Sequence, residues 1–249
     1  MKRLLKIADD KRSRLLNVML GTCCAFVAGA INAGGFLILG SYTSHISGTI
    51  AGISDAVVLG NAAVVWLGFS AVGSFFLGAF MASVLIQIAQ ARKLHSSFAL
   101  ALLCSGCVLI ALGVWATFSQ DPTREQLVLL LGFFFSMGMQ NATVSRLSNY
   151  ETRATHMTGV VTDIGIELGK WISRSASYNR EKLIAMGLIL SAFLGGGILG
   201  AIAMKSVLGT LSICLFGGVL VSLALFPVYR DTHIRMRYLK KAHHRKVNN

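Results

Sequence analysis

The chain has few charged residues. Asp, Glu, Lys and Arg make up only 13% of its 249 residues, whereas a soluble globular domain carries about 25%. Hydrophobic residues make up 54%, so an ordinary soluble domain is excluded. Six long stretches without charge each hold the roughly 20 apolar residues that a helix needs to cross a bilayer. We therefore predict an all-α integral membrane protein with six transmembrane helices, at residues 16–40, 62–89, 97–118, 126–145, 184–204 and 207–228.

Acidic residues are especially scarce: there are 10 Asp and Glu against 23 Lys and Arg, and no acidic residue lies inside a predicted span. This argues against an exporter of multivalent cations, which needs buried carboxylates. The sequence also lacks a Gly-x-Ser-x-Gly turn, a His-Glu-x-x-His helix and a correctly spaced phosphate loop. Cys104 and Cys107 form a CxxC, but no cysteine in an outside loop could relay electrons to them, so we interpret them as packing residues. We expect no enzyme, no cofactor and no metal site.

The net charge of +13 is unevenly distributed. If the N-terminus is cytoplasmic, 21 Lys and Arg lie in inside segments and only Arg124 and Lys205 lie outside. Because Lys and Arg stay on the cytoplasmic side, this asymmetry predicts a multi-pass protein of the bacterial inner membrane with both termini in the cytoplasm. The basic tails, residues 1–14 and 229–249, then need no partner beyond anionic lipid headgroups, and we expect no nucleic-acid binding.

A short phrase occurs twice. Residues 44–50 read SHISGTI, and residues 155–161 read THMTGVV, with His156 standing 111 positions after His45 (156 minus 45). Other segments also recur, namely 29–32 with 138–141 and 73–79 with 195–201. The repeat predicts a single membrane domain, residues 1–249, made of two related halves at about 15–118 and 126–228. Since each half has three spans, the second half is inverted relative to the first, as in many secondary transporters.

The same residues resemble a known family. The segments GMQNATVSRL and ATHMTGVVTDIGIELG, together with the His-x-Ser-Gly phrase of the first half, are similar to the YoaK family of bacterial inner-membrane proteins. The first half departs from the family pattern, because Asn32 stands where Asp is common, Ser47 where Thr is common and Thr49 where Asn is common. The resemblance implies a six-span membrane protein and no particular activity.

The repeated phrase supplies the candidate site. If each copy begins a half-helix inside the membrane, its backbone N–H groups and positive dipole end attract an anion. Ser47 and Thr158 would satisfy free N–H groups at these helix starts, and the two His residues could carry a proton. The predicted substrate-binding residues are Asn32, His45, Ser47, Gly48, Asn141, His156, Thr158, Gly159 and Asp163.

Structural interpretations of these residues stay open. The two Asn side chains can staple helices together, and a Ser or Thr with a Gly precedes many ordinary helices. After Gly159, the polar residues Asp163, Glu167, Lys170 and Arg174 follow helical spacing, which favours a helix lying along the cytoplasmic interface.

Two functions follow from these interpretations. The first is a secondary transporter of a small, anionic solute with proton coupling, and the alternative is a membrane scaffold or assembly protein whose repeated phrases only pack helices. The sequence is compatible with a homo-oligomer.

Overall fold

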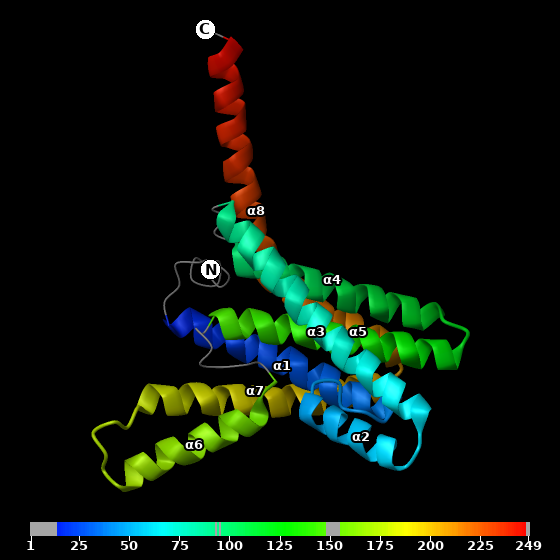
Figure 1. Cartoon of the computed structure of the whole chain (residues 1–249). Helices are drawn as coiled ribbons and strands as arrows, with labels where there is room; N and C mark the ends of the chain where they lie inside the picture. Colours follow the sequence, from blue (N-terminus) through cyan, green and yellow to red (C-terminus); the bar gives the residue numbers. More distant parts are fainter. Residues whose placement is uncertain (1–13, 93, 95, 148–154, 248–249) are drawn as a thin grey trace.

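The computed structural model describes residues 14–92, 94, 96–147 and 155–247, and within these residues it is entirely helical. Figure 1 shows long helices packed into a bundle, with two shorter helices, α2 and α6, on one side. The elements are α1 (Arg14–Leu39), α2 (Ile46–Val58), α3 (Ala62–Ala91), α4 (Ser97–Phe118), α5 (Pro122–Leu147), α6 (Met157–Ile172), α7 (Arg180–Lys205), the 3-10 turn η2 (Gly209–Leu211) and α8 (Ser212–Val247).

The six predicted spans are confirmed. Six helical segments are long and apolar enough to cross a membrane, and they correspond to α1, α3, α4, α5, α7 and the part of α8 up to Arg230. The largest differences from the prediction lie in the last span, expected at 207–228, because α8 begins only at Ser212, after η2, and continues to Val247. Helices α5 and α7 begin four residues earlier than expected (122 against 126 and 180 against 184). With 13 and 16 residues, α2 and α6 are shorter than a bilayer requires.

Polar residues in the connections start several of these helices. The Asn61 side chain accepts a hydrogen bond from the Val64 N–H at 3.2 Å, and the Asn179 side chain accepts one from the Lys182 N–H at 3.0 Å. Before α5, the Asp121 carboxylate accepts from the N–H groups two and three residues later. Each of these side chains pairs with a donor that the first turn of a helix leaves unsatisfied.

The backbones of α1 and α7 are in direct contact. A Cβ atom on Gly29 would lie 2.0 Å from the carbonyl oxygen of Phe193, and one on Gly196 would lie 2.0 Å from the carbonyl oxygen of Phe26. No side chain fits at such distances, so the two glycines allow the helices to approach closely.

The contact between α3 and α5 has the same form. A Cβ atom on Gly78 would lie 2.0 Å from the carbonyl oxygen of Phe135, and one on Gly138 would lie 2.0 Å from that of Phe75. On all four helices the Phe therefore precedes its Gly by three residues. The first helix of each half packs on the second long helix of the other half.

The third close contact joins α4 and α8, which are the last helices of the two halves. A Cβ atom on Gly106 would lie 2.8 Å from the carbonyl oxygen of Gly217, and one on Gly217 would lie 2.7 Å from that of Gly106. The two glycines therefore contact each other reciprocally. This contact joins the two halves, as the α1–α7 and α3–α5 contacts do.

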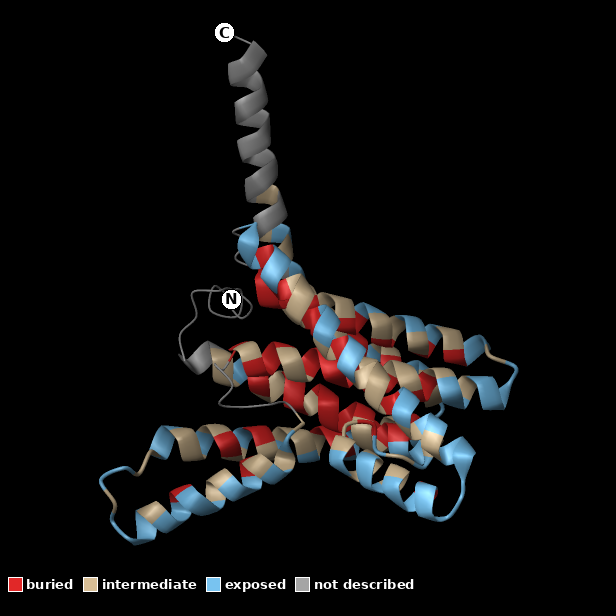
Figure 2. Ribbon diagram, viewed as in Figure 1, coloured by how far each residue is buried: buried red, intermediate tan, exposed pale blue. Residues whose placement is uncertain are grey.

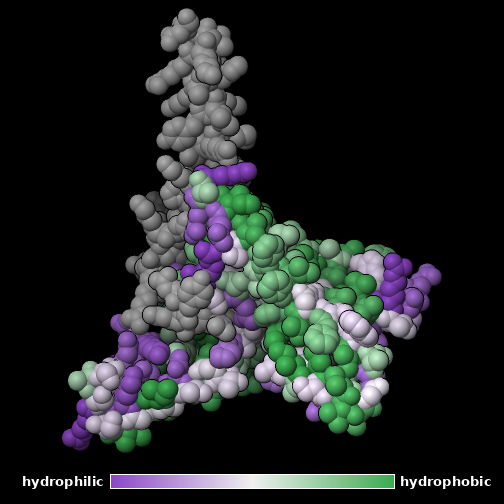
Figure 3. Space-filling view, viewed as in Figure 1, coloured by the Kyte–Doolittle hydropathy of each residue, from purple (hydrophilic) through white to green (hydrophobic). Residues whose placement is uncertain are grey.

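The surface is that of a protein surrounded by lipid. Buried residues gather in the middle of the bundle (Figure 2), while large apolar side chains such as Trp66 and Phe69 of α3 are exposed. Figure 3 shows a hydrophobic area over α3 and α2, with hydrophilic residues at the α6–α7 turn and, on the opposite side of the view, at the α4–α5 connection. Such a band between two polar ends is what a bilayer environment requires.

Candidate functional site

The connection after α1 folds back into the bundle. The Oδ1 atom of Asn32 accepts hydrogen bonds from the backbone N–H of Ser44 at 3.0 Å and from its hydroxyl at 2.9 Å. Asn32 lies seven residues before Leu39, the last residue of α1, which corresponds to about 10 Å along the helix axis. Ser44, and with it the start of α2, therefore lies about two helical turns inside the end of α1.

The second half repeats this arrangement. The Oδ1 atom of Asn141 accepts a hydrogen bond from the backbone N–H of Thr155 at 3.1 Å, and its Nδ2 group donates to the Thr155 hydroxyl. Asn141 lies six residues before Leu147, the last residue of α5, or about 9 Å along the axis. The start of α6 therefore also lies inside the bundle.

The short helices α2 and α6 run outward from these starting points. In Figure 1 their N-terminal ends point toward the middle of the molecule and their C-terminal ends point away from it, on opposite sides of the view. Helix α2 packs on α3, and α6 packs on α7. Each short helix is therefore held at its start by an Asn of one long helix and along its length by another.

The two His residues occupy the N-cap positions of these helices. His45 precedes α2 and His156 precedes α6, and both imidazoles are exposed. A Cβ atom on Gly48 would lie 2.1 Å from the Cδ2 atom of His45, and one on Gly159 would lie 2.3 Å from the Nδ1 atom of His156. The glycine of each phrase therefore leaves room for the imidazole three residues earlier.

The predicted capping role of Ser47 and Thr158 is wrong. Both are the second residue of their helices, and neither N-cap carries a side-chain capping hydrogen bond. The residues that secure the helix starts are instead Ser44 and Thr155, through the two Asn side chains. A hydroxyl at the second helical position is too far along the chain to accept from the N–H groups of its own first turn.

Backbone donors remain at both helix starts. The N–H of Thr49 donates to the carbonyl oxygen of His45, and the N–H of Val160 donates to that of His156, so the regular helical pattern begins only there. Within the described part of the chain, no hydrogen bond is formed by the N–H groups of Ser47, Gly48 and Thr158. These donors, with the positive end of each helix dipole, are available to an anion.

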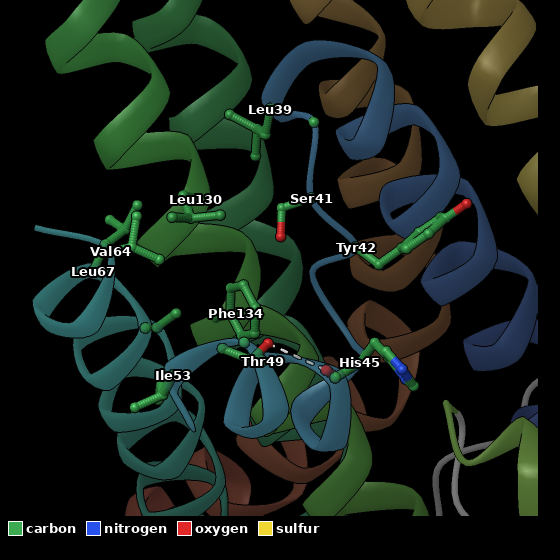
Figure 4. A pocket seen from close by; sticks show the side chains of 15 residues that line it. Leu39, Ser41, Tyr42, His45, Thr49, Ile53, Val64, Leu67, Leu130 and Phe134 are labelled. Carbon is green, nitrogen blue, oxygen red and sulfur yellow. Dashed lines mark hydrogen bonds between the residues drawn. The ribbon is translucent and has the colours of Figure 1, made fainter. Parts of the chain in front are cut away.

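A cavity of about 390 Å³ lies next to the start of α2, between α2, α3, α5 and the α1–α2 connection (Figure 4). In Figure 4 the Ser41 hydroxyl points into the space among the lining side chains, while the His45 imidazole points away from Leu130 and Phe134. The lining includes His45 and Gly48 but no candidate residue of the second half. A shared cavity for His45 and His156 therefore stays a prediction.

Charged residues cluster where α6 meets the start of α7. Glu167 is only 1% exposed, and its carboxylate accepts hydrogen bonds from the Asn179 backbone N–H and from the Lys170 ammonium, each at 3.0 Å. The Lys182 ammonium lies 3.9 Å from Glu167 and 3.7 Å from Asp163. The Asn179 N–H, followed by the Lys170 ammonium, holds the pKa of Glu167 below its usual range.

The polar residues of α6, which the sequence placed at helical spacing, do not all lie on an exposed face. Glu167 and Val160 are buried against the bundle, whereas the apolar Val161 and Trp171 are 54% and 60% exposed. The helical period was predicted correctly, but the buried face was not, because Glu167 is needed to pair with the start of α7. Asp163, a predicted substrate-binding residue, is partly exposed and forms the ion pair with Lys182.

Comparison with known proteins places the chain among membrane proteins. The family described as "Protein of unknown function (DUF1275)" matches residues 20–226. A UPF0700 transmembrane protein of Rhizobium meliloti (strain 1021) is 26% identical over 222 residues, which cover 88% of this chain and 91% of that protein. No solved structure matches the chain. The YoaK name stays a prediction.

Proposed function

Because the chain belongs to the DUF1275 family, whose function is unknown, its role has to be inferred from its own residues, and we propose that it is a secondary transporter of a small anionic solute. The solute would bind between the starts of α2 and α6, with Asn32, Asn141 and the two His residues around it. The observation that carries this proposal is that both short helices begin inside the bundle, tethered by equivalent Asn side chains.

Equivalent contacts support an inverted repeat of the two halves. The Phe and Gly residues that join α1 to α7 correspond one by one to those that join α5 to α3. Gly106 and Gly217 contact each other, as two residues beside a two-fold axis do. In transporters built this way, interrupted helices near the bilayer midplane hold the solute.

The chemistry at the helix starts favours an anion. Among the described residues, the N–H groups of Ser47, Gly48 and Thr158 form no hydrogen bond, and the positive ends of two helix dipoles lie beside them. The six predicted spans contain no Asp or Glu to repel a negative charge. Thr43, two residues before His45, is fully buried, and its hydroxyl has no partner within the described residues. A bound solute or water would relieve the cost of that hydroxyl.

Proton coupling would use the two imidazoles, because a His side chain can both accept and donate a proton. We further propose that the protein lies in the bacterial inner membrane with both termini in the cytoplasm, as the uneven distribution of Lys and Arg favours. Reporter fusions that placed either terminus outside would contradict this orientation.

The decisive experiment is uptake into liposomes that contain the purified protein, screened over small organic and inorganic anions at several pH values. We expect uptake of at least one anion that depends on the pH gradient and that falls at least tenfold in His156→Ala, with His45→Ala acting in the same direction. Asp163→Asn, which changes the side chain that pairs with Lys182, should reduce uptake less than either His variant. If every anion failed to be transported, or if the double His variant kept the uptake and pH dependence of the wild type, the repeated phrases would be packing devices in a scaffold protein.

A further inference from the structure

The cavity beside α2 has apolar walls and a polar end. Its apolar lining comes from Leu39, Ile53, Val64, Leu67, Ala71, Leu130 and Phe134. The residues with polar side chains in the lining belong to the first turn of α2 and the connection before it, and they are Ser41, Tyr42, His45 and Thr49. This lining contains no Asp, Glu, Lys or Arg. Such walls suit a ligand that is apolar along most of its length.

The matching place in the second half is filled by the protein itself. The Phe and Gly contacts relate α3 to α7 by 118 positions (196 minus 78), so Gly68 corresponds to Met186 and Ala71 to Ile189. Thr49, four residues after His45, corresponds to Val160, four residues after His156. Met186, Ile189 and Val160 are 2%, 3% and 5% exposed and pack together with Ala25 of α1.

In the first half, the large side chains stand on a different helix. Phe134 and Leu130 of α5 correspond, at an offset of 109 (138 minus 29), to the smaller Ala25 and Gly21 of α1. The large side chains therefore stand on the α5 side, and Ile53 of α2 lies against Gly68, where a Cβ atom would be 2.4 Å from its Cγ1 atom. The cavity lies among these side chains, with Gly68 and Ala71 of α3 in its lining. In the second half, two apolar side chains, those of Met186 and Ile189, occupy the corresponding position.

We propose that the cavity binds the apolar chain of the transported solute, which is therefore a small organic anion with an alkyl chain of a few carbons. This inference rests on the proposed function, because the head of the solute is taken to lie at the start of α2. The inference gives the chemical class of the solute. It also identifies Ala71 as the residue that limits the length of the solute's alkyl chain. Ala71 packs in the wall of the cavity with Leu130 and Phe134 and is 2% exposed.

Binding of a series of straight-chain carboxylates tests the proposal without a known substrate. Radiolabelled acetate, butyrate, hexanoate and octanoate are equilibrated by dialysis with the full-length protein in lipid nanodiscs, with empty nanodiscs as the blank. We expect affinity to rise about fourfold for each added methylene until the cavity is full. Ala71→Ile, which places in the first half the residue that fills the second, should lower hexanoate affinity at least tenfold and leave acetate affinity unchanged.

The matched control is Ile189→Ala, which opens the corresponding place in the second half and should leave hexanoate affinity within twofold of wild type. Circular dichroism and gel filtration identify variants that fail to fold, and Ala71→Val then provides a milder filling of the cavity.

An affinity that does not depend on chain length, or an equal loss in both variants, would overturn the inference. Binding of uncharged 1-hexanol as tight as that of hexanoate would also overturn it and would identify the cavity as a site for lipid chains. Chain-dependent binding without uptake into liposomes would instead contradict transport and leave the cavity assignment intact.

Discussion

Gly196 of α7 lies against the backbone of Phe26 in α1, so that a Cβ atom at this glycine would be 2.0 Å from the Phe26 carbonyl oxygen. At its neighbour Gly195, no atom outside the adjoining backbone of α7 and the two flanking residues lies within 4 Å of the same position. The two glycines therefore stand one residue apart in one helix and differ only in what they face.

This difference predicts the effect of a single methyl group. Gly196→Ala should destabilise the protein by about 1–3 kcal/mol, because α1 and α7 must move apart. Gly195→Ala, which adds a methyl group in open space, should be neutral or slightly stabilising, since Ala favours the helix over Gly. Thermal unfolding in a mild detergent compares the two variants, and equal melting temperatures would contradict the close contact.

The Asn tether predicts local loosening at the start of α2. Asn32→Ala removes the acceptor of the Ser44 N–H and hydroxyl, and we expect a loss of about 1–2 kcal/mol in stability. Hydrogen exchange of the segment 43–50 should become faster, while that of α4 stays unchanged. Asn32→Asp keeps an oxygen acceptor in the same place and should preserve the slow exchange, whereas fast exchange in that variant would argue against the tether.

The Gly of the phrase predicts the position of the imidazole. Gly48→Ala places a methyl group where the His45 ring lies, so the ring must move away from the first turn of α2. We expect faster modification of His45 by diethyl pyrocarbonate, followed by mass spectrometry of the peptide. Gly52→Ala is the control in the same helix, because no atom of another residue lies within 4 Å of a Cβ there. The second half offers the same comparison, with Gly159→Ala against Gly165→Ala.

The buried carboxylate predicts a dependence of stability on pH. The pKa of Glu167 is lowered in the folded protein, so its charged form stabilises the fold above the unfolded value of about 4.5. This contribution is lost as the pH falls below 4.5 and through the lower folded pKa. Glu167→Gln should therefore be less stable than wild type at pH 7, and the difference should shrink below pH 4.5. A difference in melting temperature that stayed constant from pH 7 to pH 3.5 would contradict this assignment.

The long helices could be predicted well from the sequence, because a segment of about twenty apolar residues without charge is typical of a transmembrane helix. It also identified Asn32 and Asn141 together with the repeated phrase, because these residues recur at similar spacing in both halves. The structure shows why they recur: each Asn binds the residue directly before a His.

Other features depended on contacts between distant segments. Residues 73–79 were matched to 195–201 at an offset of 122, one helical turn away from the offset of 118 that the Phe and Gly contacts give. Small residues recur so often in α3 and α7 that sequence alone does not fix their register. The role of Glu167 was also missed, since its main partner is a backbone N–H at Asn179, beyond the end of its own helix.

The exchange of partners between the halves affects the order in which the protein is assembled. Helix α5 meets its partner α3 shortly after it is synthesised, whereas Gly29 of α1 contacts Phe193, which is synthesised 164 residues later (193 minus 29). At typical synthesis rates this delay is on the order of 10–30 s. During that time the membrane, or a chaperone within it, has to shield the exposed backbone of α1. A ribosome that stalls before α7 therefore leaves a truncated chain, α1 to α6, whose first helix lacks its main packing partner.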